Sequence, residues 1–168
     1  MAGVLLLHSD SDKWLDAPFE RIKRVSNTRV GAVGQDFMEN YAASLGVECI
    51  FPLNAAGKRA TQSPWDIQLD GIKFELKTAS EDVSGNFQFN HIRLHRVYDA
   101  VLCLGIAPAT LYFGMWTKAD IATGKAGSIV SMEKGANASY KLTKRSANLS
   151  PISEFRDTFT DFHSDWKP

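Results

Sequence analysis

Apolar positions in the first part of the chain follow a helical spacing. From Val33 they recur at Phe37, Tyr41 and Leu45, with Gly46 directly after the last of them. Apolar residues three or four positions apart form one face of an amphipathic helix, and glycine is a common residue just after a helix end. The pattern therefore predicts a helix from Val33 to Leu45.

The next positions change to a spacing typical of strands. Residues 47–51 indicate a short strand, and residues 65–69 and 72–79 form two longer β-type runs. Only Asp70 and Gly71 separate these two runs. A two-residue Asp-Gly connector is the strongest short-range signal for a β-hairpin, so residues 65–79 are predicted to form one.

The second half of the chain mixes apolar runs with a looser segment. Residues 89–98 repeat apolar positions at helix-like intervals, and residues 100–106 and 111–116 are continuous apolar runs that predict buried strands. Residues 118–150 contain six basic and two acidic side chains and are expected to be irregular. A final helix is expected over residues 151–163.

The start of that last helix is indicated by Ser150 and Pro151, which suit the N-cap and the first helical position. Phe155, Phe159 and Phe162 then fall on one stripe. The first 30 residues show no clear period. They include the basic side chains Arg21, Lys23, Arg24 and Arg29, for which a solvated surface is favoured over a ligand contact.

Composition places the chain among ordinary globular proteins. Its 168 residues are 44% hydrophobic and 23% charged, which fits a single domain over residues 1–168 with a real core. Nineteen basic and nineteen acidic residues cancel, so any nucleic-acid binding must come from local patches. The apolar run at residues 4–7 is too short for a signal segment, and no stretch is long enough to span a membrane. A cytoplasmic protein is expected, with Cys49 and Cys103 as free thiols.

The hairpin places chemically significant residues together. With Asp70 and Gly71 as the turn, Asp66 is predicted to face Glu75, and Lys77 to project on the same side as Glu75. Two opposed carboxylates destabilise a hairpin unless a cation lies between them. A hard ion such as Mg²⁺ prefers carboxylate oxygens and leaves positions for phosphate oxygens, and Mn²⁺ is expected to substitute for it.

A simpler interpretation competes with this one. A lone Glu-x-Lys on a strand is usually a solvated surface. Here a Lys opposite Glu75 would stabilise a purely structural hairpin, yet the opposed residue is another acid. The combination of Asp66, Glu75 and Lys77 on one face therefore favours a catalytic site in which both acids bind metal and Lys77 assists the attacking water.

The motif resembles that of the PD-(D/E)xK nuclease superfamily, which includes most type II restriction endonucleases. It stands here as Pro64-Trp65-Asp66 followed by Glu75-Leu76-Lys77, with Trp65 separating the Pro from the Asp. The resemblance covers approximately residues 32–116. It implies an α/β or α+β fold with a restriction-endonuclease-like core, a central mixed β-sheet flanked by helices.

The resemblance also suggests further site residues. Glu39 is the candidate for an additional metal ligand on the helix before the hairpin, with a solvated side chain as the equal alternative. Gln88 and Asn90 are candidates for supporting the site. His91 and His95 would share a helix face, but no third ligand at a suitable spacing supports a zinc pair. The candidate DNA contacts are Lys58, Arg59, His91, Arg93, Arg96, Lys141, Lys144 and Arg145.

Three functions remain open at this point. The favoured one is a Mg²⁺-dependent endonuclease of double-stranded DNA, most like a small type II restriction enzyme, for which a symmetric target implies a homodimer. A repair or junction-resolving nuclease of the same fold is the second. A non-catalytic DNA-binding module is the third.

Overall fold

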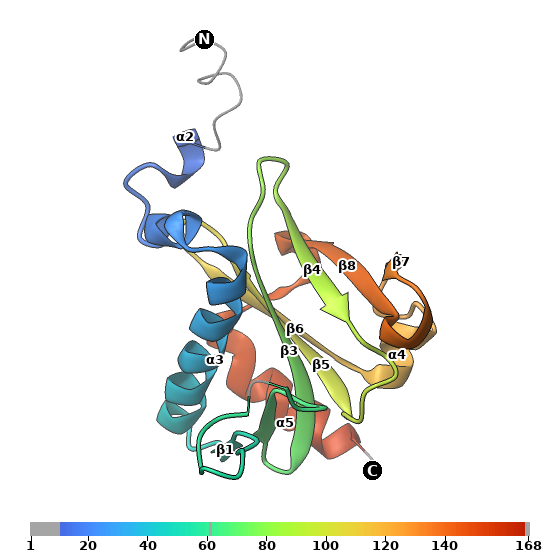
Figure 1. Ribbon diagram of the computed structural model, residues 1–168. Coiled ribbons are helices and arrows are strands. Elements are labelled where there is room, and N and C mark those ends of the chain that lie inside the picture. The colour runs from blue at the N-terminus through green and yellow to red at the C-terminus, as the bar shows by residue number, and fades with distance from the viewer. Residues whose placement is uncertain (1–10, 61, 167–168) are drawn as a thin grey trace.

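The computed structural model describes residues 11–60 and 62–166, and it has a mixed six-stranded sheet at its centre (Figure 1). The strand order is β1-β2-β3-β5-β6-β9, in which β3 and β5 run parallel and the other neighbours are antiparallel. The predicted mixed sheet is therefore confirmed. The strands are β1 (Cys49–Ile50), β2 (Ile67–Leu69), β3 (Ile72–Ser80), β5 (Ala100–Ile106), β6 (Leu111–Thr117) and β9 (Ser150–Pro151).

Two helices cover one face of this sheet. Helix α3 (Asn27–Ser44) contributes Met38 and Ala42, and α5 (Phe155–Asp165) contributes Phe155 and Phe159, to a cluster that includes Phe74 of β3. All five side chains are at most 2% exposed, so this layer forms the main hydrophobic core. The aromatic stripe predicted for the last helix is confirmed at its two buried positions.

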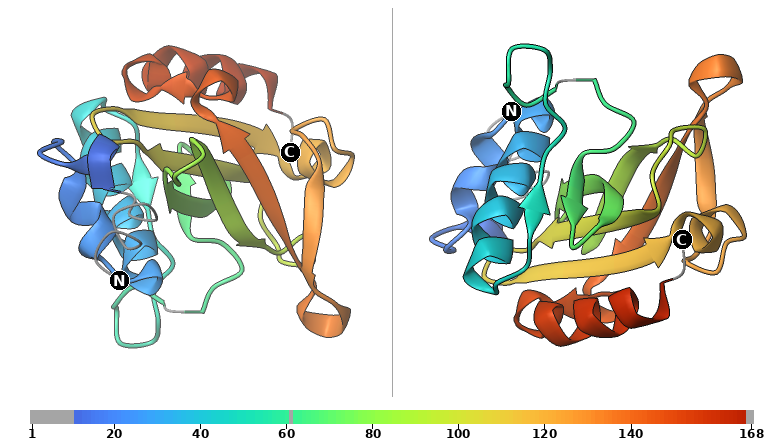
Figure 2. Two further views of the ribbon diagram at one scale, coloured as in Figure 1. Left: turned by 90° about the horizontal axis from the view of Figure 1, so that it is seen from above. Right: turned by 90° about the horizontal axis from the view of Figure 1, so that it is seen from below.

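A second, three-stranded sheet covers the opposite face instead of further helices. It consists of β4 (Asn86–Ile92), β8 (Ser139–Arg145) and β7 (Ile129–Glu133), all antiparallel. Its inner side chains pack against Val101 and Cys103 of the central sheet. Figure 2 shows α5 and this small sheet on opposite sides of the central strands. The catalytic candidates on β3 lie on the side of the small sheet.

The hairpin forms with the predicted turn. Asp70 and Gly71 have φ values of 40° and 90°, and Ile67 pairs with Phe74 as the last residue pair of the β2–β3 ladder. Positive φ at both turn residues is the geometry that an Asp-Gly connector favours. Asp66 lies just beyond the ladder, where its amide donates to the carbonyl of Phe74 at 2.8 Å.

The predicted helix over residues 89–98 is wrong, because residues 86–92 form strand β4. Phe87 and Phe89 are buried while Gln88 and Asn90 are exposed, which is the two-residue alternation of a strand. A β-bulge shifts the register between Phe89 and Ile92, where His91 has a φ of 59°. The extra residue makes two buried positions lie three apart and so imitates a helical spacing.

The region expected to be irregular is also ordered. Residues 118–150 contain the short helix α4 (Lys118–Ala122) together with β7 and β8. Strand β8 was hidden from sequence analysis because Lys141 and Lys144 occupy positions within it. The predicted cap at Ser150 and Pro151 is wrong as well, since these residues pair with Phe113 and Tyr112 as an edge strand, where proline is tolerated.

Helices begin earlier than the apolar pattern indicated. The N-terminal region holds α2 (Ser11–Trp14) and the 3₁₀ helix η1 (Glu20–Arg24), and α3 starts at Asn27 rather than Val33. The predicted apolar run at residues 4–7 lies outside the described residues. Both cysteines are free thiols. Within the described residues, no helix has the length and apolar character needed to cross a membrane.

Helix α3 approaches β3 most closely at Gly34. A Cβ atom there would lie 1.9 Å from Oγ1 and 2.9 Å from Cβ of Thr78, so a side chain forces the helix away from the sheet. We expect Gly34→Ala to lower the free energy of unfolding by about 1 to 3 kcal/mol. Gly31→Ala is the matched control, because nothing lies within 4 Å of its added Cβ, and alanine there stabilises the helix by up to about 1 kcal/mol. Urea unfolding measures both, and equal effects would contradict this packing.

Candidate active site

The three predicted catalytic residues meet at one end of the hairpin. Asp66 Oδ2 accepts a hydrogen bond of 2.8 Å from the amide of Leu76, which places its carboxylate beside the Glu75-Leu76 backbone. Lys77 projects on the same face as Glu75, and its Nζ lies 2.8 Å from Glu75 Oε1. Glu75 and Lys77 therefore share a face as predicted, whereas Asp66 lies outside the ladder and reaches the strand through the Leu76 amide rather than as the paired residue of Glu75.

Glu75 is buried and held from two sides. Its side chain is only 2% exposed, and its Oε2 accepts a hydrogen bond of 3.1 Å from the amide of Arg93, which follows the bulge of β4. A buried carboxylate costs free energy unless it is paired. The ion pair with Lys77 and the Arg93 amide supply that pairing, so the small sheet helps to fix the orientation of Glu75.

Two buried oxygens in this site lack a hydrogen bond of regular geometry within the described residues. They are Glu75 Oε1, which has only the ion pair with Lys77, and the hydroxyl of Tyr98. Burial raises the pKa of the Tyr98 hydroxyl, and the negative charges of Glu75 and Asp66 raise it further. A neutral hydroxyl beside two carboxylates can only donate to them, which adds a second group able to orient Glu75.

The carboxyl of Asp66 has a raised pKa. Burial raises its pKa above the ordinary value of 3.8, and the charge of Glu75 raises it further, while Lys77, the Leu76 amide and Arg96 act in the opposite direction. The charged form of Asp66 is therefore disfavoured by its surroundings. A bound cation would reverse this penalty.

This shift predicts a pH-dependent stability effect at Asp66. A raised pKa in the folded state means that the stabilising contribution is complete below 3.8 and is lost as pH rises through the folded-state pKa. We expect Asp66→Asn to unfold at a higher temperature than the wild type near neutral pH, and the difference to shrink as pH falls toward 3.8. Thermal unfolding across pH tests this, with Asp157→Asn on the exposed side of α5 as control. A lower unfolding temperature for Asp66→Asn at neutral pH would contradict it.

The structure does not bring Glu39 to this site. Glu39 forms an ion pair with Arg59, which also bonds Asp36 at 2.8 Å and stacks on the ring of Phe51. Among the described residues, no group of three or more acidic, histidine or cysteine side chains gathers as a metal site. Asp66 and Glu75 are thus the carboxylates available to a metal in this site, and Arg59 is neutralised by its acidic partners.

An open groove begins at Lys77. Its volume is about 480 Å³, and it runs between the start of α3, the free edge of β3 and the strand β4. Lys77 lines the groove, whereas Asp66 and Glu75 do not. The remaining lining residues that carry polar side chains are Lys23, Asn27, Thr78, Ser80, Asp82, Gln88, Asn90 and His91.

Sequence analysis missed the wall formed by Lys23 and Asn27. These residues belong to η1 and α3, and they lie across the groove from β4 only because both elements pack beside β3. The basic run that includes Lys23 was a visible signal, but it carried no information about which element it would face. Gln88, Asn90 and His91 do line the groove, as their suggested role requires.

The histidine pair does not form. His91 lies in the bulge of β4, where its Nδ1 is 3.4 Å from the hydroxyl of Ser139 and 3.7 Å from the carboxylate of Glu133. His95 follows after the strand has ended, so the shared helix face expected for the two residues is absent. The structure gives no support to a zinc pair at these positions.

Two of the suggested DNA contacts have structural partners near the acids. Arg93 bonds Glu75 through its backbone, which leaves its side chain available. Arg96 donates a hydrogen bond of 3.1 Å to the carbonyl of Ser63, and its own carbonyl accepts one of 2.5 Å from Lys118. Arg96 therefore ties the segment before Asp66 to the segment after β4.

The suggested contacts on β8 divide between its two faces. Arg145 pairs with Asn86 and is exposed on the outer face of the small sheet. Lys144 instead pairs with the buried Phe87, and its Nζ lies 4.8 Å from the ring centre of Trp116 beneath the sheet. Burial lowers the pKa of Lys144.

The other basic candidates differ in their exposure to solvent. Lys58 is exposed in the loop before the hairpin, far along the chain from the groove-lining residues, while Lys141 is half-buried at the outer face beside the exposed Val130. The outer face of the small sheet therefore offers Lys141 and Arg145 next to the amide side chain of Gln88. This face continues into the groove through Gln88.

Comparisons with known proteins find likeness among solved structures alone. No family model matches the chain, and no curated protein matches it. The bacterial homing endonuclease I-Ssp6803I is a similar solved structure, with a TM-score of 0.45 and 15% sequence identity over 71% of this chain and 75% of that one. A likeness this distant leaves the function to be judged from the geometry of the site.

Proposed function

We propose that this chain is a metal-dependent DNA endonuclease. The observation that supports the proposal is that Glu75 and Lys77 lie on one face of β3, with the carboxylate of Asp66 bonded to the Leu76 amide between them, at the end of an open polar groove. Phosphodiester hydrolysis needs a metal held by oxygen ligands and a group that handles the attacking water. The hairpin supplies candidates for both roles.

The residues fit a hard divalent cation such as Mg²⁺ or Mn²⁺. Glu75 Oε1 is buried without a regular hydrogen bond, and the charge of Asp66 is disfavoured by its surroundings. Mg²⁺ commonly uses one or two protein carboxylates and keeps its other positions for water and phosphate oxygens. When bound, such an ion polarises a phosphoryl oxygen and acidifies a bound water.

The backbone and side-chain groups around this position have separate roles. The Arg93 amide holds Glu75 Oε2 in place, and the Leu76 amide holds Asp66 Oδ2. Lys77 lines the groove, so its ammonium group is placed to donate to an attacking water or to the negative charge that develops on the phosphate. In the structure Lys77 is paired with Glu75. A bound metal ion would neutralise the charge of Glu75 in place of Lys77.

DNA is proposed to lie along the groove and the outer face of the small sheet. Lys23 and Lys77 line the groove, while Lys141 and Arg145 carry positive charge onto the sheet. Lysine and arginine position the phosphate backbone, and amide side chains such as that of Gln88 can bond base edges. Strands β4 and β8, which carry these basic and amide side chains, suit the groove of a DNA duplex.

The finer proposal is a type II restriction enzyme that acts on duplex DNA as a homodimer. A two-fold symmetric target places one active site on each strand when two copies bind together. A repair or junction-resolving nuclease would use the same hairpin on a branched substrate. The two differ in what they cut, which an assay can resolve.

The experiment incubates plasmid DNA and a synthetic four-way junction with the protein in Mg²⁺, in Mn²⁺ and in excess chelator. We expect cleavage that requires the metal. Discrete plasmid fragments support the restriction enzyme, whereas cleavage of the junction alone supports the repair enzyme. If neither DNA is cut with either metal while the protein still binds DNA, the chain is a binding module and the proposal is wrong.

A further inference from the structure

A hydrogen-bonded pair of side chains lies in the groove near the turn between β3 and β4. Gln88 Nε2 donates to Asp82 Oδ2 at 3.0 Å, and both residues line the groove. Gln88 is exposed, because it lies between the buried Phe87 and Phe89 along β4 and points to the other face. One end of the Gln88 amide is therefore held by Asp82, and the other end is open to a ligand in the groove.

The turn fixes Asp82 in its place. Its Oδ1 accepts hydrogen bonds of 2.9 Å from the amides of Ser84 and Asn86, and its own amide donates to the Asn86 carbonyl at 2.8 Å. Burial acts to raise the pKa of the Asp82 carboxyl, but the hydrogen bonds that it accepts in the turn and from Gln88 lower it below the ordinary value of 3.8. The carboxylate is thus ionised at neutral pH, and its Oδ2 can only accept.

An ionised carboxylate determines the orientation of the Gln88 amide. A glutamine side chain has a carbonyl oxygen and two N–H groups, and half a turn about the last bond exchanges their positions. If Oε1 lay toward Asp82, two acceptors would face each other, so the amide keeps Nε2 on that side. Oε1 and the second N–H are left at the exposed end. Gln88 thereby presents one acceptor and one donor to the groove.

These two groups match the major-groove edge of adenine. Adenine presents there a donor at N6 and an acceptor at N7, and a glutamine amide can bond both at once. Guanine presents two acceptors, and cytosine presents a donor. A phosphate is a poorer ligand at this position, because the negative charge of Asp82 repels it. The lysines that line the same groove, Lys23 and Lys77, suit the phosphates instead.

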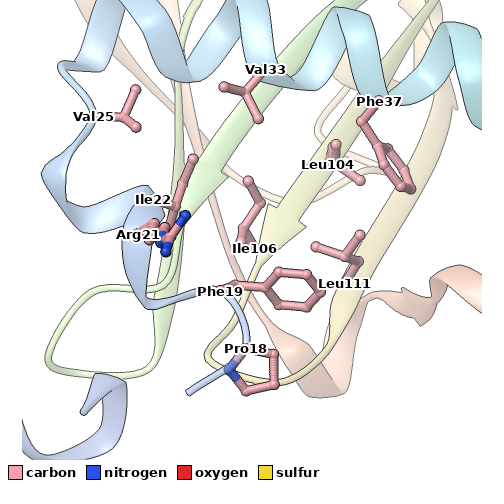
Figure 3. Close-up of a pocket in the computed structure, with 10 residues that line it drawn as sticks. All are labelled: Pro18, Phe19, Arg21, Ile22, Val25, Val33, Phe37, Leu104, Ile106 and Leu111. Carbon is pink, nitrogen blue, oxygen red and sulfur yellow. The ribbon is translucent and has the colours of Figure 1, made fainter. Parts of the chain in front are cut away.

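The cavity on the other side of η1 lacks this chemistry. Ile22 lines an apolar pocket of about 300 Å³ between η1, α3 and the ends of β5 and β6, whereas the next residue, Lys23, lines the groove (Figure 3). Nearly all the side chains around that pocket are hydrophobic, and Arg21 is the charged one among them. Base edges are read by matched donors and acceptors, so the polar groove is the cavity suited to them.

We propose that Gln88 reads an adenine in the major groove of DNA and that Asp82 is the positioning residue that fixes the Gln88 amide for this contact. The inference rests on the part of the proposed function that lays DNA along the groove, and it does not require cleavage. A bidentate contact of this kind discriminates against the wrong bases on the order of tenfold or more.

Selection of bound duplexes from a random pool tests the proposal with the full-length chain, in excess chelator so that bound DNA is not cut. We expect the wild type to enrich adenine on the order of tenfold at one position of its site. In Asp82→Asn, Oδ1 keeps the turn amides and the new amide nitrogen replaces Oδ2. Gln88 must then turn Oε1 toward that nitrogen and present its N–H groups to the groove. We expect guanine to replace adenine at the same position, because guanine presents two acceptors.

The double variant Asp82→Asn/Gln88→Glu exchanges donor and acceptor within the pair and leaves the net charge unchanged. It keeps a hydrogen bond between the two side chains but presents a carboxylate oxygen to the groove. We expect cytosine at the same position, because cytosine N4 is a donor. Gln35→Glu is the control, since it makes the same substitution on α3 at a residue that does not line the groove, and adenine should be retained.

An identical base preference in the wild type and in both Asp82 variants, or no enrichment of adenine by the wild type, would overturn the inference. Plasmid cleavage in Mg²⁺ and Mn²⁺ by the same preparation separates this outcome from a failure of the proposed function. A protein that cuts DNA without the adenine preference refutes the role of Gln88 and leaves the nuclease proposal intact. A protein that shows the expected series of preferences but never cuts refutes the nuclease alone, and a lack of DNA binding contradicts both.

Discussion

Lys77→Gln is expected to lower the rate of metal-dependent DNA cleavage by about 10² to 10³-fold, the usual effect of removing one charge-stabilising donor from an active site. Lys77 is the member of the catalytic group that lines the groove, and its ammonium group is 2.8 Å from Glu75. Glutamine keeps a hydrogen-bond donor beside the buried carboxylate but loses the charge. The rate is measured on saturating DNA, so that a loss of chemistry is separated from a loss of binding.

Lys73→Gln is the matched control for this prediction. Lys73 belongs to the same strand and the same alternation as Lys77, but it lies four residues away and does not line the groove. We expect Lys73→Gln to cut DNA at nearly the wild-type rate. If the two lysine variants lose activity equally, or if Lys77→Gln cuts normally while folded, Lys77 has no role in the reaction.

Loss of either carboxylate is expected to abolish metal binding and with it on the order of 10³-fold or more of the cleavage rate, because the metal supplies several kcal/mol of transition-state stabilisation. The relevant variants are Asp66→Asn and Glu75→Gln. A metal that binds the folded protein raises its unfolding temperature. We therefore expect Mg²⁺ or Mn²⁺ to stabilise the wild type and to leave both variants unchanged.

This thermal measurement does not depend on DNA cleavage, and Asp157→Asn provides its control. Asp157 is an exposed carboxylate on α5, so its loss should leave the metal-induced shift intact. A shift of wild-type size in Asp66→Asn and Glu75→Gln would mean that the ion binds elsewhere. The proposed division of roles between these acids and Lys77 would then be wrong.

The hairpin was predictable because its information is local. Asp70 and Gly71 determine the turn type, the turn determines the register, and the register puts Glu75 and Lys77 on one face. The apolar runs of β5 and β6 were equally visible, because strands buried in a sheet need no polar positions. The centre of the fold and the common face of Glu75 and Lys77 could therefore be derived from sequence.

The small sheet was not predictable by the same argument. The bulge at His91 changes the period of β4 from two to three, and Lys144 occupies an inward position of β8 with its ammonium group over the ring of Trp116. Neither feature produces a periodic pattern in the sequence. Both depend on packing between segments that are far apart in the sequence, such as those that contain Phe87 and Lys144.

The far wall of the groove depends on tertiary structure in a similar way. Lys23 and Asn27 line the same groove as Lys77, beside a helix α3 that Gly34 allows to approach Thr78 closely. A glycine within a helix is visible in the sequence, but the strand that it faces is not. Likewise, the ion pair between Arg59 and Glu39 removes a suggested metal ligand through a contact between residues 20 positions apart.

The most direct test of the central claim is the cleavage of plasmid DNA by the purified wild-type protein in Mg²⁺ or Mn²⁺, run beside Asp66→Asn. We predict that the wild type cuts the plasmid only when the metal is present, and that Asp66→Asn leaves it intact under the same conditions. Intact plasmid with the wild type in both metals, or equal cutting by the two proteins, would contradict the assignment of Asp66, Glu75 and Lys77 as a nuclease centre.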